Sequence, residues 1–144
     1  MSFAAKAYAS TQNQTNVDSS SSSELIVIVY ERIFDHLKMG KNELSNGSWG
    51  VEYFSKAIDL INLGLLASLD LNKGGEIAKN LKNVYEWSVK TINHARITRS
   101  PEEIQEVVHV LETLYEGWLT ISPKKEYRQL TNLPTPTKQA SVSY

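Results

Sequence analysis

The chain has 144 residues, 41% of them hydrophobic, and its formal net charge is −1. This length predicts a single domain with a buried core. The balanced charge disfavours a nucleic-acid binder or a polybasic membrane protein, because both need clustered positive charge. The lack of cysteine excludes a disulfide framework, a thiolate nucleophile and cysteine-ligated zinc or iron–sulfur sites, and it fits a reducing cytosol.

The two ends of the chain differ in composition from its middle. Residues 9–23 contain only two apolar side chains and end in five consecutive serines, and no signal-peptide pattern precedes them. Such a segment buries too little surface to offset its ordering entropy, so we expect a flexible leader over residues 1–23. Residues 122–144 hold three of the four prolines and are expected to form a loose tail. The longest uncharged apolar stretch, residues 60–69, is too short to span a membrane.

The first helix is expected over residues 24–44, where an Asn-Gly pair follows. Ser21 and Glu24 have the spacing of a capping box, which predicts the start of a helix. The β-branched residues of the run 25–30 favour a strand by propensity. We nevertheless predict a helix, because the helical spacing of apolar residues continues as far as Leu37.

Two further helices are expected on either side of a glycine-rich turn. The first covers residues 50–69, and the second begins at Gly75 or Glu76 and continues to Ile97. In both, apolar residues recur at intervals of three and four, as in an amphipathic helix. The expected core positions are Phe54, Ala57, Ile58, Ile61, Leu65 and Leu69 in the first, and Ile77, Leu81, Val84, Ser88, Ile92 and Ala95 in the second.

The last helix has the clearest start signal. Ser100 is a preferred capping residue, Pro101 fits the first helical position and Glu103 fits the third. The apolar pattern continues to Ile121. Four helices joined by short connections predict an all-α fold, an antiparallel four-helix bundle over residues 24–121.

The helix over residues 50–69 carries more apolar side chains than one buried stripe needs. Leu60, Leu63 and Ala67 lie well away from the main apolar face, and Leu66 lies at its margin. Two interpretations stay open from the residues alone. The leader, the tail or a second copy covers this surface, or it forms a groove for an amphipathic helix of another protein.

No catalytic or metal-binding motif is complete in this sequence. The segment that starts at Asp70 begins like a calcium-binding loop, but Gly74 and Leu81 stand where oxygen ligands are needed. Glu106 and His109 have the spacing of a di-iron ligand pair, but no second pair has this spacing. We therefore expect no enzyme activity, no metal and no cofactor.

One segment resembles the signature of a known family. Residues 69–85 read Leu-Asp-x-x-Lys-Gly-Gly-Glu-Ile-Ala-x-Asn-Leu-x-x-x-Tyr, which resembles the flagellin-specific export chaperones. Shorter matches in the same order are Lys-Ala-Tyr-Ala at residues 6–9, Glu-Leu-Ile at 24–26, Ser-Lys-Ala-Ile at 55–58 and Ile-Ser-Pro at 121–123. The resemblance covers about residues 4–124.

The resemblance implies a cytoplasmic four-helix bundle without catalysis or a cofactor. It implies that apolar grooves bind the disordered C-terminal segment of flagellin, keep it from polymerising and help deliver it to the flagellar export apparatus. It also implies that the leader, with Ala5 and Tyr8, covers part of the groove and bears on docking to the export gate. Neither nucleic acid nor membrane insertion is implied, and we expect a monomer or a weak homodimer.

With this resemblance, the apolar surplus becomes a candidate flagellin-binding groove. The turn between the second and third helices is expected to contain Asp70, Gly74 and Gly75. The competing hypothesis is an oligomeric structural subunit without cargo, which buries its surplus surface against itself. The candidate groove residues are Leu60, Leu63, Leu66, Ala67, Ile77, Leu81, Tyr85, Val108, Leu111 and Tyr115.

Four positions depart from the family pattern. Ser22 stands where a proline usually precedes the first helix, and Arg32 replaces a common glycine. Ala5 is smaller than the usual apolar residue of the leader, and Arg96 stands where asparagine is frequent. None of them falls in the glycine-rich turn, so the resemblance supports the fold more strongly than it supports individual contacts.

Overall fold

The computed structural model describes residues 19–121, and the leader before residue 19 and the tail from residue 122 lie outside the described residues. The described elements are α3 (Ser19–Ser45), α4 (Val51–Asp59), the π-helix η1 (Leu60–Leu66), α5 (Leu71–Thr98) and α6 (Pro101–Ile121), and no strand occurs among them.

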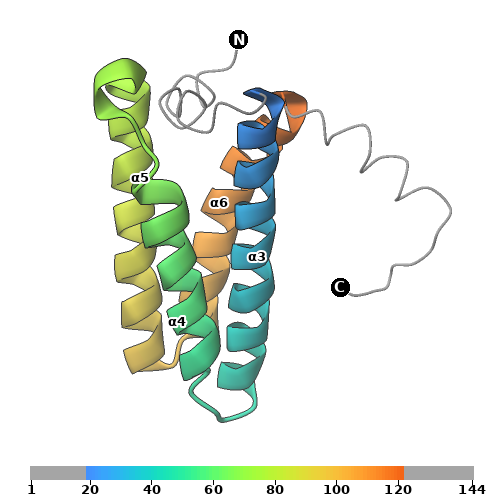
Figure 1. Ribbon diagram of the computed structural model, residues 1–144. Helices are drawn as coiled ribbons and strands as arrows, with labels where there is room; N and C mark the ends of the chain where they lie inside the picture. The colour runs from blue at the N-terminus through green and yellow to red at the C-terminus, as the bar shows by residue number, and fades with distance from the viewer. Residues whose placement is uncertain (1–18, 122–144) are drawn as a thin grey trace, which may run out of the picture.

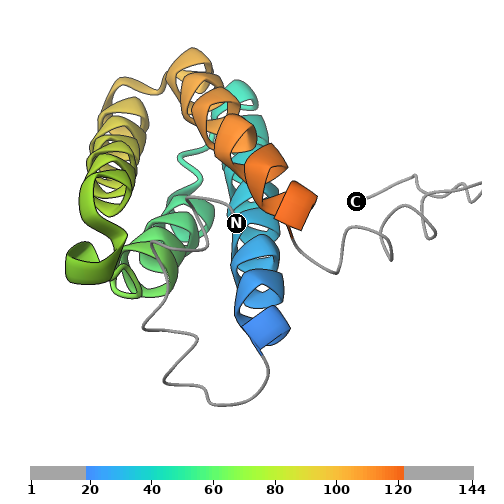
Figure 2. The same cartoon turned by 90° about the horizontal axis from the view of Figure 1, so that it is seen from above.

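The elements form an antiparallel four-helix bundle, as the sequence predicts (Figure 1). Helix α4 and the π-helix η1 follow each other without a break and make up the second of the four rods. Helix α3 packs against α4 and α6, and α5 packs against α6, α4 and η1. The view along the bundle in Figure 2 shows the same cyclic order of neighbours.

Helix α3 begins at Ser19, five residues before the expected start at Glu24. The serine run that was expected to belong to the leader is therefore helical over residues 19–23. Ser23, two residues after the expected capping position Ser21, is buried. Serine costs only a fraction of a kcal/mol in a helix, so the serine run can extend α3 beyond the capping signal.

The second rod differs from the single α-helix expected over residues 50–69. It starts at Val51 as an α-helix, changes to a π-helix at Leu60 and ends at Leu66. The wider turn is visible in the bond from the amide of Ala67 to the carbonyl of Asn62, five residues earlier, at 3.0 Å. Gly64 lets η1 approach α3 closely, because a Cβ atom there would lie 3.1 Å from Val29 Cγ1.

The glycine-rich turn becomes the capped start of α5. The Asp70 carboxylate accepts hydrogen bonds from the amides of Asn72 (3.0 Å) and Lys73 (2.9 Å), which would otherwise lack helical partners. Gly75 then interrupts the helix with φ 56° and ψ −134°, a conformation that is nearly exclusive to glycine. The predicted start at Gly75 or Glu76 thus corresponds to the regular part of α5, which one capped turn precedes.

The start of α6 is confirmed at Pro101, with Ser100 as its cap. The Glu103 amide donates to Ser100 Oγ at 3.2 Å. The Glu103 carboxylate is bound to His94 Nδ1 of α5 at 2.7 Å, which links the two helices next to their connection.

The core runs the length of the bundle and contains most of the predicted apolar positions. At its centre, the hydroxyl groups of Tyr30 and Tyr85 lie 2.6 Å apart in a buried hydrogen bond between α3 and α5. Both hydroxyl groups are thereby satisfied away from water, which buried polar atoms require. The largest fully buried side chains are Trp118, Tyr30, Tyr85, Phe54, Ile33, Leu37, Ile61, Leu65, Ile92, Ile104 and Leu111.

Candidate binding surface

An apolar surface lies where η1 turns into α5. Leu63 is 72% exposed and Leu71 is 49% exposed, although both are large aliphatic side chains. Leu71 lines a hollow of about 300 Å³, and Leu63 follows the lining residue Asn62 directly in the chain. Its lining comprises Asn62, Leu66, Ala67, Leu69, Leu71, Lys82 and Glu86. We call these lining residues together with Leu63 the η1 surface.

The π-helix determines which side chains reach this surface. Ile61 and Leu65 are fully buried, so the residues between and after them point elsewhere. Leu66 is half-buried against the core, and Ala67 is exposed beyond it. π-Helical segments occur often at functional sites, because the extra residue redirects neighbouring side chains. Here the π-helix leaves an apolar edge facing solvent.

Charged groups border the η1 surface on the α5 side. Lys82 Nζ lies 3.1 Å from Glu86 Oε2, and both side chains are about half exposed. A pair of this kind contributes little to stability, since water screens it. The aliphatic stem of Lys82 and the two charges instead give the hollow a polar rim beside its leucines.

The structure divides the ten predicted groove residues into three groups. Leu60, Leu63, Leu66 and Ala67 lie on η1 or directly after it, and Ile77 on α5 is half-buried. Leu81, Tyr85 and Leu111 are buried in the core, where they offer almost no area to a partner.

The third group lies on α6 and faces α3. Val108 lines a second hollow of about 250 Å³ between these helices, together with Phe34 and Leu37. Tyr115 is half-buried, and its hydroxyl donates to Glu31 Oε2 at 2.8 Å. The predicted residues therefore belong to two separate surfaces and the core, and the structure does not join them into one groove.

Sequence reasoning missed two apolar residues of the η1 surface, Leu69 and Leu71, besides its polar residues Asn62, Lys82 and Glu86. Leu69 was expected in the core, but the rod ends at Leu66 and leaves Leu69 half-buried beside the hollow. Leu71 follows the capping residue Asp70 directly and belongs to neither of the predicted apolar faces of the second and third helices, so no sequence signal pointed to it.

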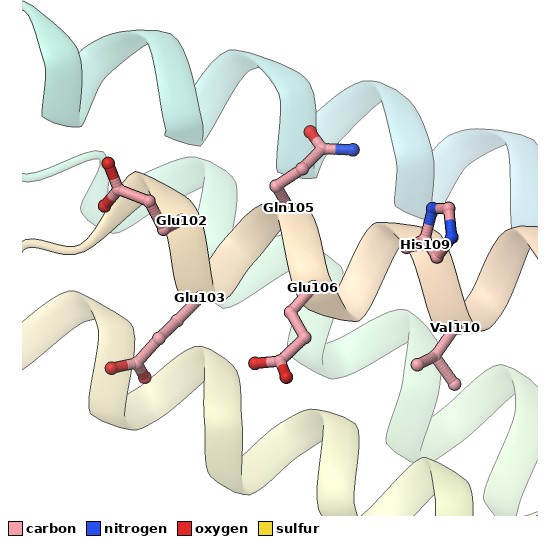
Figure 3. Close-up of a pocket in the computed structure, with 6 residues that line it drawn as sticks. All are labelled: Glu102, Glu103, Gln105, Glu106, His109 and Val110. Atoms are coloured by element: carbon pink, nitrogen blue, oxygen red, sulfur yellow. The ribbon is translucent and has the colours of Figure 1, made fainter.

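A larger hollow, of about 560 Å³, lies along α6, and most of its lining residues are charged or polar. Figure 3 shows Glu103 and Glu106 pointing toward α5, while Gln105 and His109 lie on the other side of α6. Glu106 and His109, which have the spacing of a di-iron ligand pair, thus point apart and do not converge on a common ion. Among residues 19–121, no group of three or more acidic, histidine or cysteine side chains is placed to hold a metal ion.

The fold and the η1 surface define a class of protein, a four-helix bundle with an exposed apolar surface. The family model described as "Flagellar protein FliS" matches residues 4–125. The chain belongs to this family. Membership supports a chaperone role in flagellar export, which is not an enzyme class.

Individual relatives agree over most of their length. The flagellar secretion chaperone FliS of Salmonella typhimurium is 34% identical over 126 residues, which are 86% of this chain and 93% of the relative. The FliS protein of Vibrio cholerae is 27% identical over 128 residues, or 88% of this chain and 92% of the relative. That of Campylobacter jejuni is 31% identical over 109 residues. In the described part of the chain, no helix is both long and apolar enough to cross a membrane.

Proposed function

We propose that this protein is a cytoplasmic export chaperone that binds the disordered C-terminal segment of flagellin. In this proposal it prevents premature flagellin polymerisation and assists delivery to the flagellar export apparatus. The observation that supports it most directly is the η1 surface, where a fold with a well-packed core leaves Leu63, Leu66 and Leu71 accessible. Leu66 and Leu71 line one hollow, and exposed apolar side chains around a hollow are typical of a surface for an amphipathic helix.

The physical properties of such a surface fit a carrier. A disordered segment that folds on binding loses its own conformational entropy, so its affinity per buried area is lower than that of a preformed partner. The cargo can therefore be bound over a large surface and still be released. The second hollow, with Phe34 and Val108, gives a long cargo segment a further contact on another side of the bundle.

The leader belongs to the same proposal. Ala5 and Tyr8, which the resemblance connects with docking at the export gate, lie outside the described residues. We expect the leader to compete with cargo for the apolar surface in the free protein and to contact the gate in the loaded one. The free protein is expected to be a monomer or a weak homodimer.

Leu66→Asp is the sharpest test of the cargo site. The carboxylate would lose its water when an apolar helix covers the hollow, and the nearby Lys82 is already paired with Glu86, so we expect at least about tenfold weaker binding. Isothermal titration of the full chain with a peptide of the flagellin C-terminal segment measures this effect. Far-UV circular dichroism of the variant should be unchanged, because Leu66 is only half-buried.

Met39→Asp is the matched control for this variant. Met39 is 43% exposed on α3 and lies outside the η1 surface, so the same loss of an apolar side chain should leave binding unchanged. Equal affinity of folded Leu66→Asp and wild type would remove the η1 surface as the cargo site. Light scattering distinguishes the functions themselves: a one-to-one complex with flagellin supports the chaperone, and self-association without cargo binding supports the structural subunit.

A further inference from the structure

A second exposed apolar surface lies at the opposite end of the bundle from η1. Trp49 is 52% exposed, Val51 is 55% exposed and Ile97 is 76% exposed. With Asn93 and Arg96 they line a hollow of about 370 Å³. We call these five residues the Trp49 surface. Figure 1 shows that the α3–α4 connection and the end of α5, which carry it, lie far from the turn between η1 and α5.

Trp49 is held in its exposed position by Arg99. The guanidinium carbon of Arg99 lies 4.0 Å from the centre of the Trp49 ring, and Arg99 Nη2 donates to the carbonyl of Ser48 at 3.2 Å. A cation is attracted to the face of an aromatic ring, and here the contact with Arg99 fixes one face of the Trp49 ring. The remaining surface of the indole is accessible. An exposed tryptophan that is fixed in one orientation loses little entropy on binding a partner.

The backbone conformation of Arg99 also indicates that this residue is placed to hold Trp49. Arg99 ends α5 with φ 57° and ψ 49°, and it is the one residue other than glycine with positive φ in the described chain. Glycine usually occupies such a position at a helix end, because other side chains are strained there. An arginine at this position bears strain while it holds Trp49.

The charge of the Trp49 surface is one-sided. Arg96 Nη1 donates to Asn93 Oδ1 at 3.2 Å, and Arg99 binds only the Trp49 ring and the Ser48 carbonyl. In the described part of the chain, neither guanidinium forms an ion pair with a carboxylate. The nearby Glu52 is bound to Lys56 at 3.1 Å. The surface thus offers apolar side chains beside two positive charges without local compensation.

We infer that the Trp49 surface docks an acidic, amphipathic segment of another protein, one with aliphatic or aromatic side chains next to carboxylates. Its apolar residues would cover Trp49, Val51 and Ile97, and its carboxylates would bind Arg96 and Arg99 in charge-assisted hydrogen bonds. Because this surface and η1 lie at opposite ends, the segment binds whether or not the η1 surface is occupied.

Two other occupants of the Trp49 surface would be a second copy of this chain and its own segment from residue 122 onward. The charge of the surface argues against both. A symmetric contact between two copies would place the same arginines near each other across the axis, where like charges repel. The segment from residue 122 to the end carries four basic residues and one acidic residue, so it too is repelled. An acidic partner is the occupant that satisfies both guanidinium groups.

A random peptide library, selected on the immobilised full chain, tests this inference. Binders are sorted with two variants, Ile97→Asp and Leu66→Asp, each at an exposed or half-buried position that the fold tolerates. Peptides that no longer bind Ile97→Asp but still bind Leu66→Asp are assigned to the Trp49 surface. We expect them to be enriched in Asp and Glu beside apolar residues, and to bind about tenfold more weakly to Arg96→Glu.

Lys90→Glu is the matched control for Arg96→Glu. It reverses an exposed charge on the same helix outside the Trp49 surface, so the selected peptides should bind it as they bind wild type.

The inference is overturned if no peptide depends on Ile97, if the dependent peptides lack acidic residues, or if both charge reversals act equally. It is also overturned if Ile97→Asp abolishes self-association in light scattering, or if removal of residues 122–144 strengthens peptide binding, since each result identifies a different occupant. None of these measurements uses flagellin. A failure of the proposed flagellin binding would therefore leave their results unchanged.

Discussion

The two ends of the bundle differ in how they reverse the chain. At the end with the α3–α4 connection, the Phe54 ring packs directly on Gly40 and Gly50, where added Cβ atoms would lie 2.4 Å and 2.9 Å from ring carbons. At the η1 end the second rod finishes as a π-helix, and Leu63 and Leu71 are exposed. Burial of such a leucine would contribute about 1.5–3 kcal/mol, so the η1 end gives up stability at these two positions. Both ends leave apolar side chains exposed, since Trp49 and Val51 are exposed at the α3–α4 end. The comparison teaches that the α3–α4 connection is fixed by a ring packed on two glycines, whereas the turn after η1 relies on a π-helix and a capped helix start.

The largest expected effect comes from truncating one apolar side chain at each end. Phe54→Ala removes a fully buried ring and should lower the free energy of unfolding by about 3–5 kcal/mol. Leu63→Ala removes a side chain that is mostly in water and should change it by no more than about 0.5 kcal/mol. Urea unfolding followed by circular dichroism measures both. Similar losses would show that Leu63 is covered in solution, and the contrast between the ends would disappear.

A smaller change in the free energy of unfolding is expected from substitutions at two residues with nearly the same positive φ. Gly75 at the η1 end has φ 56° and ψ −134°, whereas Arg99 at the other end has φ 57° and ψ 49°. Gly75→Ala forces a side chain into a conformation nearly exclusive to glycine and should cost about 1–3 kcal/mol. No atom lies within 4 Å of an added Cβ at Gly75, so the loss reports backbone strain alone.

Arg99→Gly is the counterpart at the other end. Glycine relieves the left-handed strain of about 1 kcal/mol, but the cation–π contact with Trp49, of similar size, is lost. We therefore expect a change in stability of less than about 1 kcal/mol. Thermal unfolding of both variants checks the pair. If Gly75→Ala costs no more than Arg99→Gly, the kink in α5 is not an obligatory part of the turn.

The sequence predicted the bundle because helical periodicity and helix-end signals agree over most of the chain. Ser100 and Pro101 gave the start of α6 correctly, since their effect is local. The start of α3 is expected at Glu24 but lies at Ser19, because a capping pattern at Ser21 does not exclude a helix that includes the serine run. Serine has only a small helix penalty, so local spacing alone does not set this boundary.

The candidate site was harder to predict than the fold. Leu63, Leu66 and Ala67 were recognised because they depart from the buried face of an amphipathic helix. The π-helix was not expected, since no residue pattern specifies it and Gly64 reveals its role only beside Val29. Leu81 and Tyr85 carry the family signature and yet are buried, because a signature records what folds the turn as well as what contacts a partner.

The smallest expected effect is a pH dependence at the packed contact between α3 and α4. The ring centres of His36 and Tyr53 lie 6.5 Å apart. Burial, and then the positive charge of Lys56, lower the pKa of His36 below its usual value of about 6.5. The unfolded chain therefore binds the proton more readily, so the folded state loses stability as the pH falls below about 6.5 toward the lowered pKa. At higher pH both states are neutral and the penalty is absent.

Two variants separate this effect from the titration of carboxylates. His36→Gln should lose less stability than wild type between about pH 7.5 and about pH 5.5, since the penalised protonation is gone. Lys56→Met removes the second cause of the shift but not the first, so the pKa of His36, followed by NMR, should rise while staying below its usual value. A pKa that does not move in Lys56→Met would mean that burial alone sets it. In that case, the pH dependence measures only how tightly α3 and α4 pack at this end of the bundle.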